Sequence, residues 1–252
     1  MAKQAAFGTV LNMGAGDVQI ETATIVGTIS NPGDINVVIT AAGMTGSPLT
    51  LVITVANGNA STVATTVRAF IVSDATAAPV RAMFDVSGAT DKVILTRKIP
   101  MADDATLNIA SDTGTATGLT TTATSANTHA GETLAPVAYI QSLGGPGLGL
   151  DTEDVTTHDS TGAFEEVVGT ILRTGDLSVD IVYDPNAASH DATTGLVSMM
   201  EARLPVGFSM VFPDTTEWAF AAYVTGFEPS SPHDGALTAA VKMKLTGAPI
   251  LE

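Results

Sequence analysis

Cysteine is absent from this chain of 252 residues. Its absence excludes disulfide bridges, metal sites with thiolate ligands and catalytic cysteine nucleophiles. Chemistry that depends on a thiol is therefore removed from the candidate functions.

Positive charge is scarce, with 10 Lys and Arg against 26 Asp and Glu and a formal net charge of −16. Proteins that grip nucleic acid by neutralising phosphates need a basic face, and this chain cannot supply a large one. The same imbalance opposes binding to anionic membranes. We therefore expect neither tight nucleic-acid binding nor membrane attachment.

Charged residues make up only 14% of the chain and aromatic residues 5%. No uninterrupted apolar stretch approaches the ~18 residues of a membrane-spanning helix, and residues 1–8 lack the pattern of a signal peptide. Hydrophobic residues nevertheless reach 45%, which is enough for a sizeable core and argues against disorder. Frequent Ala, Thr, Val and Gly favour strands and turns, so we expect a β-rich protein. Without a signal peptide or a membrane span, we expect it to be made in the cytoplasm.

The composition changes twice along the chain. Residues 27–133 are rich in Thr, Ala and Gly and hold 8 acids and 5 bases, whereas the flanking parts hold 18 acids and 5 bases. We predict a discontinuous main domain at 1–26 and 134–252, with a small α+β domain inserted at 27–133. Within the insertion, residues 114–131 have low complexity and are predicted to be a linker.

A helix and several strands are expected in the inserted segment. Asn59 precedes an apolar stripe formed by Val63, Val67, Phe70 and Ile71, which predicts an N-capped helix ending near Ser73. Strands are predicted from short runs of β-branched residues between turn-forming residues. They lie at 37–39, 49–55, 84–86, 93–95 and 106–109.

The second part of the chain alternates apolar and polar residues, as half-buried strands do. The alternating runs lie at 177–183, 206–212, 218–227 and 237–245. A helix is predicted at 189–201, although Gly195 inside it costs about 1 kcal/mol relative to Ala. The expected fold is mainly β, a β-barrel or sandwich with one flanking α-helix, plus the inserted small α+β domain.

A long polar and acidic segment at 144–166 separates these strands. Its two halves are predicted to be extended arms around a loop. Gly145, Gly147 and Gly149 resemble a nucleotide-binding loop, but acidic residues typical of a strand follow them instead of a helix. The acids and His158 lack the spacing of an EF-hand or an HExxH zinc site.

The sequence contains no convincing catalytic site. The histidines at 129, 158, 190 and 233 are scattered beside turn-forming residues and are predicted to lie on the surface. His158 and Asp159 are adjacent, and adjacent side chains cannot form a catalytic triad with Ser160. Glu165 and Glu166, if they lie on a strand, point to opposite faces. We therefore predict that the protein is not an enzyme and needs neither metal nor cofactor.

Lys242 and Lys244 lie on one face of the last predicted strand. Two alternatives remain open for them. They either meet an acidic loop of a neighbouring copy, or they form a solvated strand face that discourages aggregation.

Six segments together resemble a known family, the major tail tube proteins of long, non-contractile (siphovirus-type) bacteriophage tails. Each segment alone is unspecific, but their order along the chain is specific. The segments are GTVLNMG at 8–14, GGPGLGLDTEDVTTHD at 144–159, LSVDIVYDP at 177–185, LPVGFSMVFPD at 204–214, WAFAAYVTGFEP at 218–229 and DGALTAAVKMKLTG at 234–247.

The resemblance implies a structural virion protein that self-assembles, without a cofactor, into stacked hexameric rings forming a hollow tube for genome delivery. It also implies a virion tail location and contacts with the tape measure, tail tip and tail terminator proteins, while DNA passes through the lumen without specific binding. Typical members lack the segment at 27–133. It is expected to face outward, because the bore of a tube has no room for an inserted domain in every subunit. An alternative function is a surface-displayed decoration or adhesion module that binds host glycans or envelope through the inserted domain.

Contacts between subunits and between rings are expected mainly on the acidic segment, with two further residues on the last strand. The candidates are Gly145, Gly147, Leu150, Asp151, Glu153, Asp154, His158, Asp159, Phe164, Glu165, Glu166, Lys242 and Lys244.

Overall fold

A computed structural model describes residues 8–14, 16–160, 162 and 164–251. Strands account for 50% of the structure and helices for 13%, which confirms the predicted mainly β fold class. In the described part of the chain, no helix has the length and apolar character needed to cross a membrane. The absence of a signal peptide was predicted from residues 1–8, of which 1–7 lie outside the described ranges.

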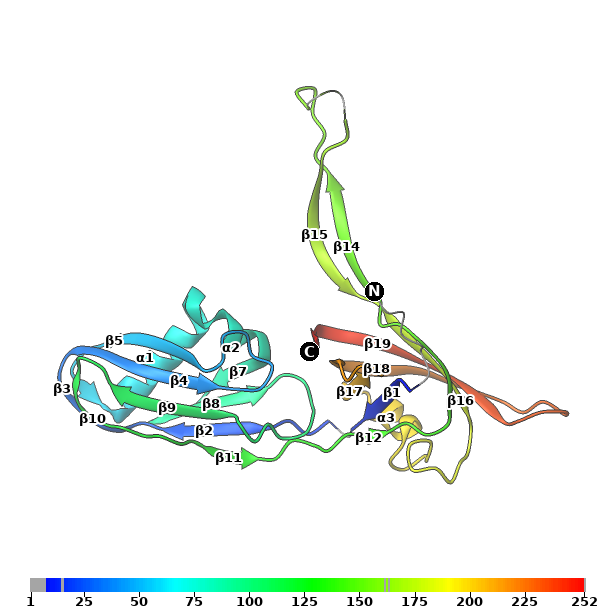
Figure 1. Ribbon diagram of the computed structural model, residues 1–252, viewed down its shortest axis with the longest axis horizontal. Helices are drawn as coiled ribbons and strands as arrows, with labels where there is room; N and C mark the ends of the chain where they lie inside the picture. Colours follow the sequence, from blue (N-terminus) through cyan, green and yellow to red (C-terminus); the bar gives the residue numbers. More distant parts are fainter. Residues whose placement is uncertain (1–7, 15, 161, 163, 252) are drawn as a thin grey trace.

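The larger unit is a curled, half-barrel sheet of seven antiparallel strands (Figure 1). Its order is β12 (Ala135–Pro136), β1 (Val10–Met13), β17 (Val206–Val211), β18 (Glu217–Ser230), β19 (Thr238–Leu251), β16 (Asp176–Val182) and β13 (Ile140–Gly144). The helix α3 (Leu196–Ala202) contributes Leu196 and Met199 to its core. Phe208 and Phe220 stack in that core with ring centroids 6.1 Å apart. The four strands predicted by alternation are all present, as is the single flanking helix.

The smaller unit contains three short sheets and has its own apolar core, formed mainly by side chains from 23 to 119. The sheets have the orders β11-β2-β8-β7, β5-β4-β9 and β10-β3-β6. Their strands are β2 (Ile20–Thr24), β3 (Val26–Asn31), β4 (Gly33–Thr40), β5 (Leu49–Val55), β6 (Gly58–Asn59), β7 (Phe84–Ser87), β8 (Lys92–Arg97), β9 (Asn108–Thr113), β10 (Thr117–Thr120) and β11 (Ala126–His129). The helices are α1 (Ala60–Ser73), the 3-10 helix η1 (Ala75–Ala77) and α2 (Ala78–Met83).

Helix α1 begins where its sequence predicts. The backbone N–H of Thr62 donates to Asn59 Oδ1 at 3.0 Å, which satisfies one of the free donors at the helix N-terminus. Val63, Val67 and Ile71 are buried against the strands. The capped amphipathic helix predicted at 59–73 is therefore confirmed.

The segment 114–131, predicted to be a linker, instead contains two strands. β10 pairs with β3 and β11 pairs with β2, and Leu119 is buried in the core of the smaller unit. Polar contacts reinforce the pairing, such as 2.9 Å between the hydroxyl oxygens of Thr22 and Thr128. Each strand lies at the edge of its sheet and is largely exposed, so its residues are mostly polar. The sequence of such a strand lacks the alternation of apolar and polar residues by which strands are predicted.

The helix predicted at 189–201 begins only at Leu196, after the N-cap Gly195. A Cβ on Gly195 would lie 2.6 Å from backbone atoms of Ser189 and Asp191, so this close turn requires glycine. The preceding turn also buries His190, contrary to the prediction that every histidine lies on the surface. Its Nδ1 accepts from the backbone N–H of Asp184 at 3.2 Å, and Nε2 lies 3.0 Å from the Ala138 carbonyl.

The chain passes between the two units twice, near Gln19 and near Glu132. The loop after β8 forms hydrogen bonds with both connections. The buried Gln19 accepts from the backbone N–H of Asp104 at 2.8 Å and donates to the Asp104 carbonyl at 3.2 Å. At the other connection, the backbone N–H of Glu132 donates to the Met101 carbonyl of that loop at 3.1 Å, and the Glu132 carboxylate accepts from the backbone N–H of Gly16 at 2.8 Å. Ile250 of β19 also packs against the core of the smaller unit.

Candidate functional site

A two-stranded hairpin projects from the larger unit (Figure 1). Strands β14 (Leu148–Asp154) and β15 (Val167–Thr174) form a sheet of their own, separate from the seven-stranded sheet. The described residues among 155–166 form the far end of the hairpin, and we call them the tip loop. We refer to residues 148–174 as the arm.

The base of the arm is held by glycine geometry. Gly145 has φ +102°, and a Cβ there would lie 2.6 Å from the Asp176 carbonyl oxygen, so another side chain would be strained. The backbone N–H of Gly175 donates to the Gly147 carbonyl at 2.6 Å. These contacts fix the direction in which the arm leaves the sheet.

The arm exposes apolar side chains that its own chain does not cover. It carries half of the large hydrophobic residues that are exposed in the described structure, and Leu172 and Phe164 are 79% and 76% exposed. The remaining ones are Leu148, Leu150, Val155, Val167, Val168 and Ile171. Contiguous exposed apolar surface of this kind marks an interaction site.

Apolar groups occupy both faces of the hairpin. Leu150 lies opposite Leu172, and residues directly opposite each other share a face. Ile171 is the next residue along β15 and therefore points to the other face. The pairing register shifts between Leu150 and Thr152, which twists the hairpin locally. Neither face has a partner sheet within the described chain.

The arm is also strongly acidic, with six carboxylates and one basic residue, Arg173. Arg173 Nε donates to Asp151 at 2.5 Å, so this one base is paired within the arm. Near the tip, hydrogen bonds from the Thr156 side chain and backbone lower the pKa of Asp154 below its ordinary value. The surface of the arm therefore combines exposed apolar side chains with carboxylates.

Most of the predicted contact residues lie on or beside this arm. Gly145 and Gly147 form its base. Four lie on β14 and five in the tip loop, namely Leu150, Asp151, Glu153 and Asp154, and then His158, Asp159, Phe164, Glu165 and Glu166. Glu165 and Glu166 precede β15, so they do not occupy opposite faces of a strand as predicted.

The acidic segment predicted to form the contacts ends at residue 166, whereas the second strand of the hairpin begins at Val167. Val167, Val168, Ile171 and Leu172 are exposed on it. The signal in the sequence was an apolar run directly after two glutamates, too short to distinguish a free strand from a buried one.

Lys242 and Lys244 lie apart from the arm, on the solvent-facing side of β19. Lys242 Nζ is 2.7 Å from Glu228 and Lys244 Nζ is 2.8 Å from Asp176, both within the same chain. Exposed pairs of this kind contribute about 0–1 kcal/mol. Within the single chain these lysines balance neighbouring acids of the sheet.

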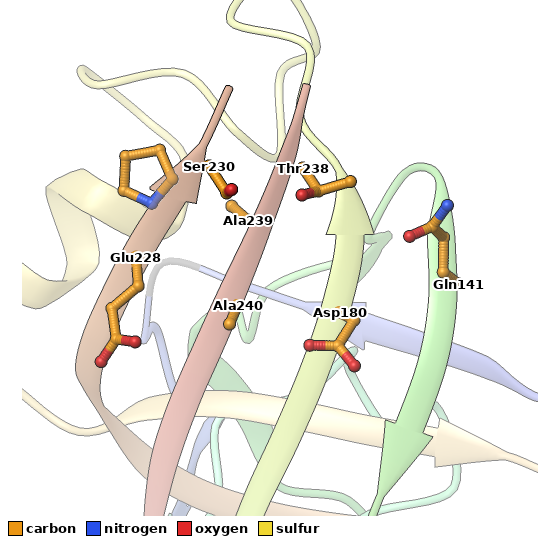
Figure 2. A pocket seen from close by; sticks show the side chains of 8 residues that line it. Gln141, Asp180, Glu228, Ser230, Thr238, Ala239 and Ala240 are labelled. Carbon is orange, nitrogen blue, oxygen red and sulfur yellow. The ribbon is translucent and has the colours of Figure 1, made fainter. Parts of the chain in front are cut away.

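The same face of the sheet has an open hollow of about 440 Å³. Figure 2 shows Asp180 and Glu228 on either side of the small Ala240. The Ser142 hydroxyl donates to Asp180 at 2.7 Å. Among the residues that the structure describes, no group of three His, Asp or Glu side chains is placed to hold a metal ion. The hollow is an open part of the sheet face, lined by two carboxylates and by small polar and apolar side chains.

No protein-family model matches the sequence, and no curated protein is similar enough to count as a relative. Several solved structures are similar in part. A chain in the tail of an empty gene transfer agent particle, with C6 symmetry, has a TM-score of 0.42 and 17% identity over 48% of this chain and 87% of its own. A chain in the virion of a native gene transfer agent has a TM-score of 0.41 and 18% identity over 47% and 88%. A chain in the sheath-tube complex of an extracellular contractile injection system has a TM-score of 0.35 and 12% identity over 46% and 82%.

Proposed function

We propose that this chain is a structural tail protein, a tube subunit that assembles with identical copies into stacked rings. The observation that carries the proposal is the arm, an ordered hairpin with apolar side chains on both faces and no cover from its own chain. The ordered series of sequence segments that resemble tail tube proteins supports the same function.

An isolated two-stranded hairpin is marginally stable in water, and it gains stability when further strands or a packed surface cover it. Identical copies provide such a surface repeatedly if the arm of one subunit lies on the sheet of the next. A head-to-tail contact of this kind closes into a ring or extends into a tube. The arm is therefore the element we assign to contacts between subunits.

The charge of the chain suits a conduit for DNA. A net charge of −16 per subunit produces a strongly negative ring, which repels phosphates and lets DNA slide. We assign to the bore the sheet face that carries Asp180 together with the ion pairs Lys242–Glu228 and Lys244–Asp176. Six subunits per ring, the virion location and the tape measure, tail tip and terminator partners rest on the sequence resemblance and are part of the same proposal.

The insertion is proposed to lie outside the ring, with boundaries shifted from those predicted at 27 and 133. Ala23 and Ile25 belong to the core of the smaller unit, whereas Leu11 and Met13 belong to the larger one. We therefore place the inserted unit at about 20–131 of the described chain. Its two aromatic residues, Phe70 and Phe84, are half-buried and buried, so neither offers an exposed ring to a glycan.

Electron microscopy of the purified chain, alone and with tail-tip components, tests the proposal. Rings or tubes are expected from the unmodified chain and not from Leu172→Asp, which places a charge on the apolar arm. The matched control is Leu204→Asp, because Leu204 is 65% exposed but lies outside the arm. A chain that forms no rings under any nucleating condition, or a Leu172→Asp variant that assembles normally, would contradict the proposal.

A further inference from the structure

Strand β5 (Leu49–Val55) leaves one edge of the smaller unit open. It lies at the end of the sheet β5-β4-β9 and pairs with β4 along its whole length. Among the described residues, no other segment hydrogen-bonds to the β5 backbone. In an antiparallel pair, alternate residues point their N–H and C=O groups away from the partner. β5 therefore presents a row of unpaired backbone groups.

This edge lacks the usual protection against pairing with another chain. Its sequence, LTLVITV, has no charge and no proline, and its register with β4 has no bulge. The other edges in the described structure are shorter or irregular. β6 and β12 have two residues, β7 carries Asp85 and β9 carries Asp112. The pairings of β10, β11 and β13, and the pairing of β14 with β15, each contain a register shift.

The strand is also symmetric about its central residue. Thr50 and Thr54 lie two positions on either side of Val52, on the exposed face of the strand. Leu51 and Ile53 lie one position on either side and are both buried. Two copies of β5 that pair antiparallel about Val52 would therefore place Thr opposite Thr, Val opposite Val and Leu opposite Ile. Pairs of these types stabilise a sheet.

We propose that two copies of this chain pair through β5, antiparallel and about a two-fold axis at Val52. The contact would join two three-stranded sheets into one of six strands, in the order β9-β4-β5-β5-β4-β9. A two-fold contact places the same patch on both partners, and the symmetric sequence of β5 meets that requirement. Pairing with an unrelated strand of another protein would not require β5 to be symmetric, so the symmetry favours a second copy as the partner.

The charge distribution favours contact between two copies through their smaller units, because the smaller unit is less negative than the rest of the chain. Residues 27–133 have a net charge of −3, whereas the remainder carries −13. The β5 segment itself is neutral, so two copies approach there with the least repulsion.

This pairing differs from the contacts of a tube. All subunits of a tube built from head-to-tail contacts point the same way, so a two-fold contact cannot join neighbours within it. It would join free subunits, or subunits of two different tubes whose inserted units face outward. The inference does not depend on the proposed function and can fail separately from it.

Sedimentation of the full chain over a range of concentrations tests the pairing, using Leu172→Asp to remove contacts through the arm. A monomer–dimer equilibrium is expected. Adding Val52→Lys should weaken it at least tenfold, because two like charges then face each other across the axis. The matched control is Val72→Lys, since Val52 and Val72 are both 56% exposed and Val72 lies on α1.

Crosslinking gives a second measurement, because the chain has no native cysteine. With a short bis-maleimide, Val52→Cys is expected to form dimers much faster than Val72→Cys. The proposal is overturned if the Leu172→Asp chain stays monomeric at all concentrations, or if Val52→Lys and Val72→Lys dimerise equally. It is also overturned if Val52→Cys crosslinks no faster than its control.

Discussion

Leu150 of β14 lies directly opposite Leu172 of β15, and both side chains are exposed in the single chain. Apolar pairs in this position normally lie under a second layer of structure. Their exposure on an ordered hairpin links the fold to assembly, because the missing layer can be supplied by another copy.

The base of the arm should be sensitive to a single methyl group. Gly145→Ala is expected to destabilise the protein by about 1–3 kcal/mol, because Gly145 has a positive φ and the added Cβ would meet Asp176. Gly149→Ala is the matched control, since a Cβ there meets nothing within 4 Å. Chemical denaturation measures the cost, and protease cleavage within the arm should be faster only for Gly145→Ala. Equal effects of the two substitutions would contradict this account of the base.

Removing a phenylalanine side chain should have different effects on stability and assembly in the apolar core and in the apolar arm. Phe208→Ala is expected to cost about 3–5 kcal/mol of unfolding free energy, because Phe208 is fully buried against Phe220. Phe164→Ala should change stability by less than about 0.5 kcal/mol but reduce assembly, because Phe164 is exposed at the tip. Thermal unfolding and microscopy of both variants separate the two roles. A large loss of stability in Phe164→Ala would show that the tip contributes to the fold of the single chain.

Helix α1 depends on its N-cap. Asn59→Ala is expected to lose about 1 kcal/mol, because the N–H of Thr62 loses its acceptor. Asn59→Asp should retain most of that stability, since aspartate caps helices equally well. Urea denaturation of the three proteins measures the difference. If Asn59→Asp is as unstable as Asn59→Ala, the hydrogen bond to Thr62 is not the stabilising contact.

Two carboxyl groups near the junction should give opposite pH profiles. Burial raises the pKa of Glu21, partly offset by the hydrogen bond from Ser125, and Asp103 and Asp104 raise it further. Its contribution to stability is therefore present below pH 4.5 and is lost as the pH rises through the folded-state pKa. Glu21→Gln is expected to stabilise the protein at pH 7 and to have little effect in acid.

Asp104 behaves in the opposite sense. Burial raises its pKa, but hydrogen bonds from Thr106 and from the backbone N–H of Ala42, with nearby Arg97, lower it overall. Its stabilising contribution is present above pH 3.8 and is lost as the pH falls through the folded-state pKa. Asp104→Asn should therefore destabilise the protein at pH 7 and do so progressively less in acid. Denaturation between pH 2 and 7 measures both variants, and parallel profiles would contradict the assignment.

The local sequence predicted those helices and strands whose residue pattern lies within a single segment. Helix α1 has both a capping residue and an apolar stripe within fifteen residues. The alternation at 177–183 and 237–245 reports which face of β16 and β19 is buried. Along the arm, the acidic segment was identified but its partner strand β15 was not, because an exposed apolar strand has the same local pattern as a buried one.

Composition, charge and periodicity in this chain thus establish a β-rich, acidic protein without thiol chemistry, since those properties belong to residues and short segments. Long-range contacts determined the remaining features. β10 and β11 become strands through partners about a hundred residues away, His190 is buried by a turn that closes over it, and Lys242 and Lys244 find acids on adjacent strands. Such pairings depend on which chain segments meet in space, and a polar edge strand or a paired lysine leaves no periodic signal in the sequence around it.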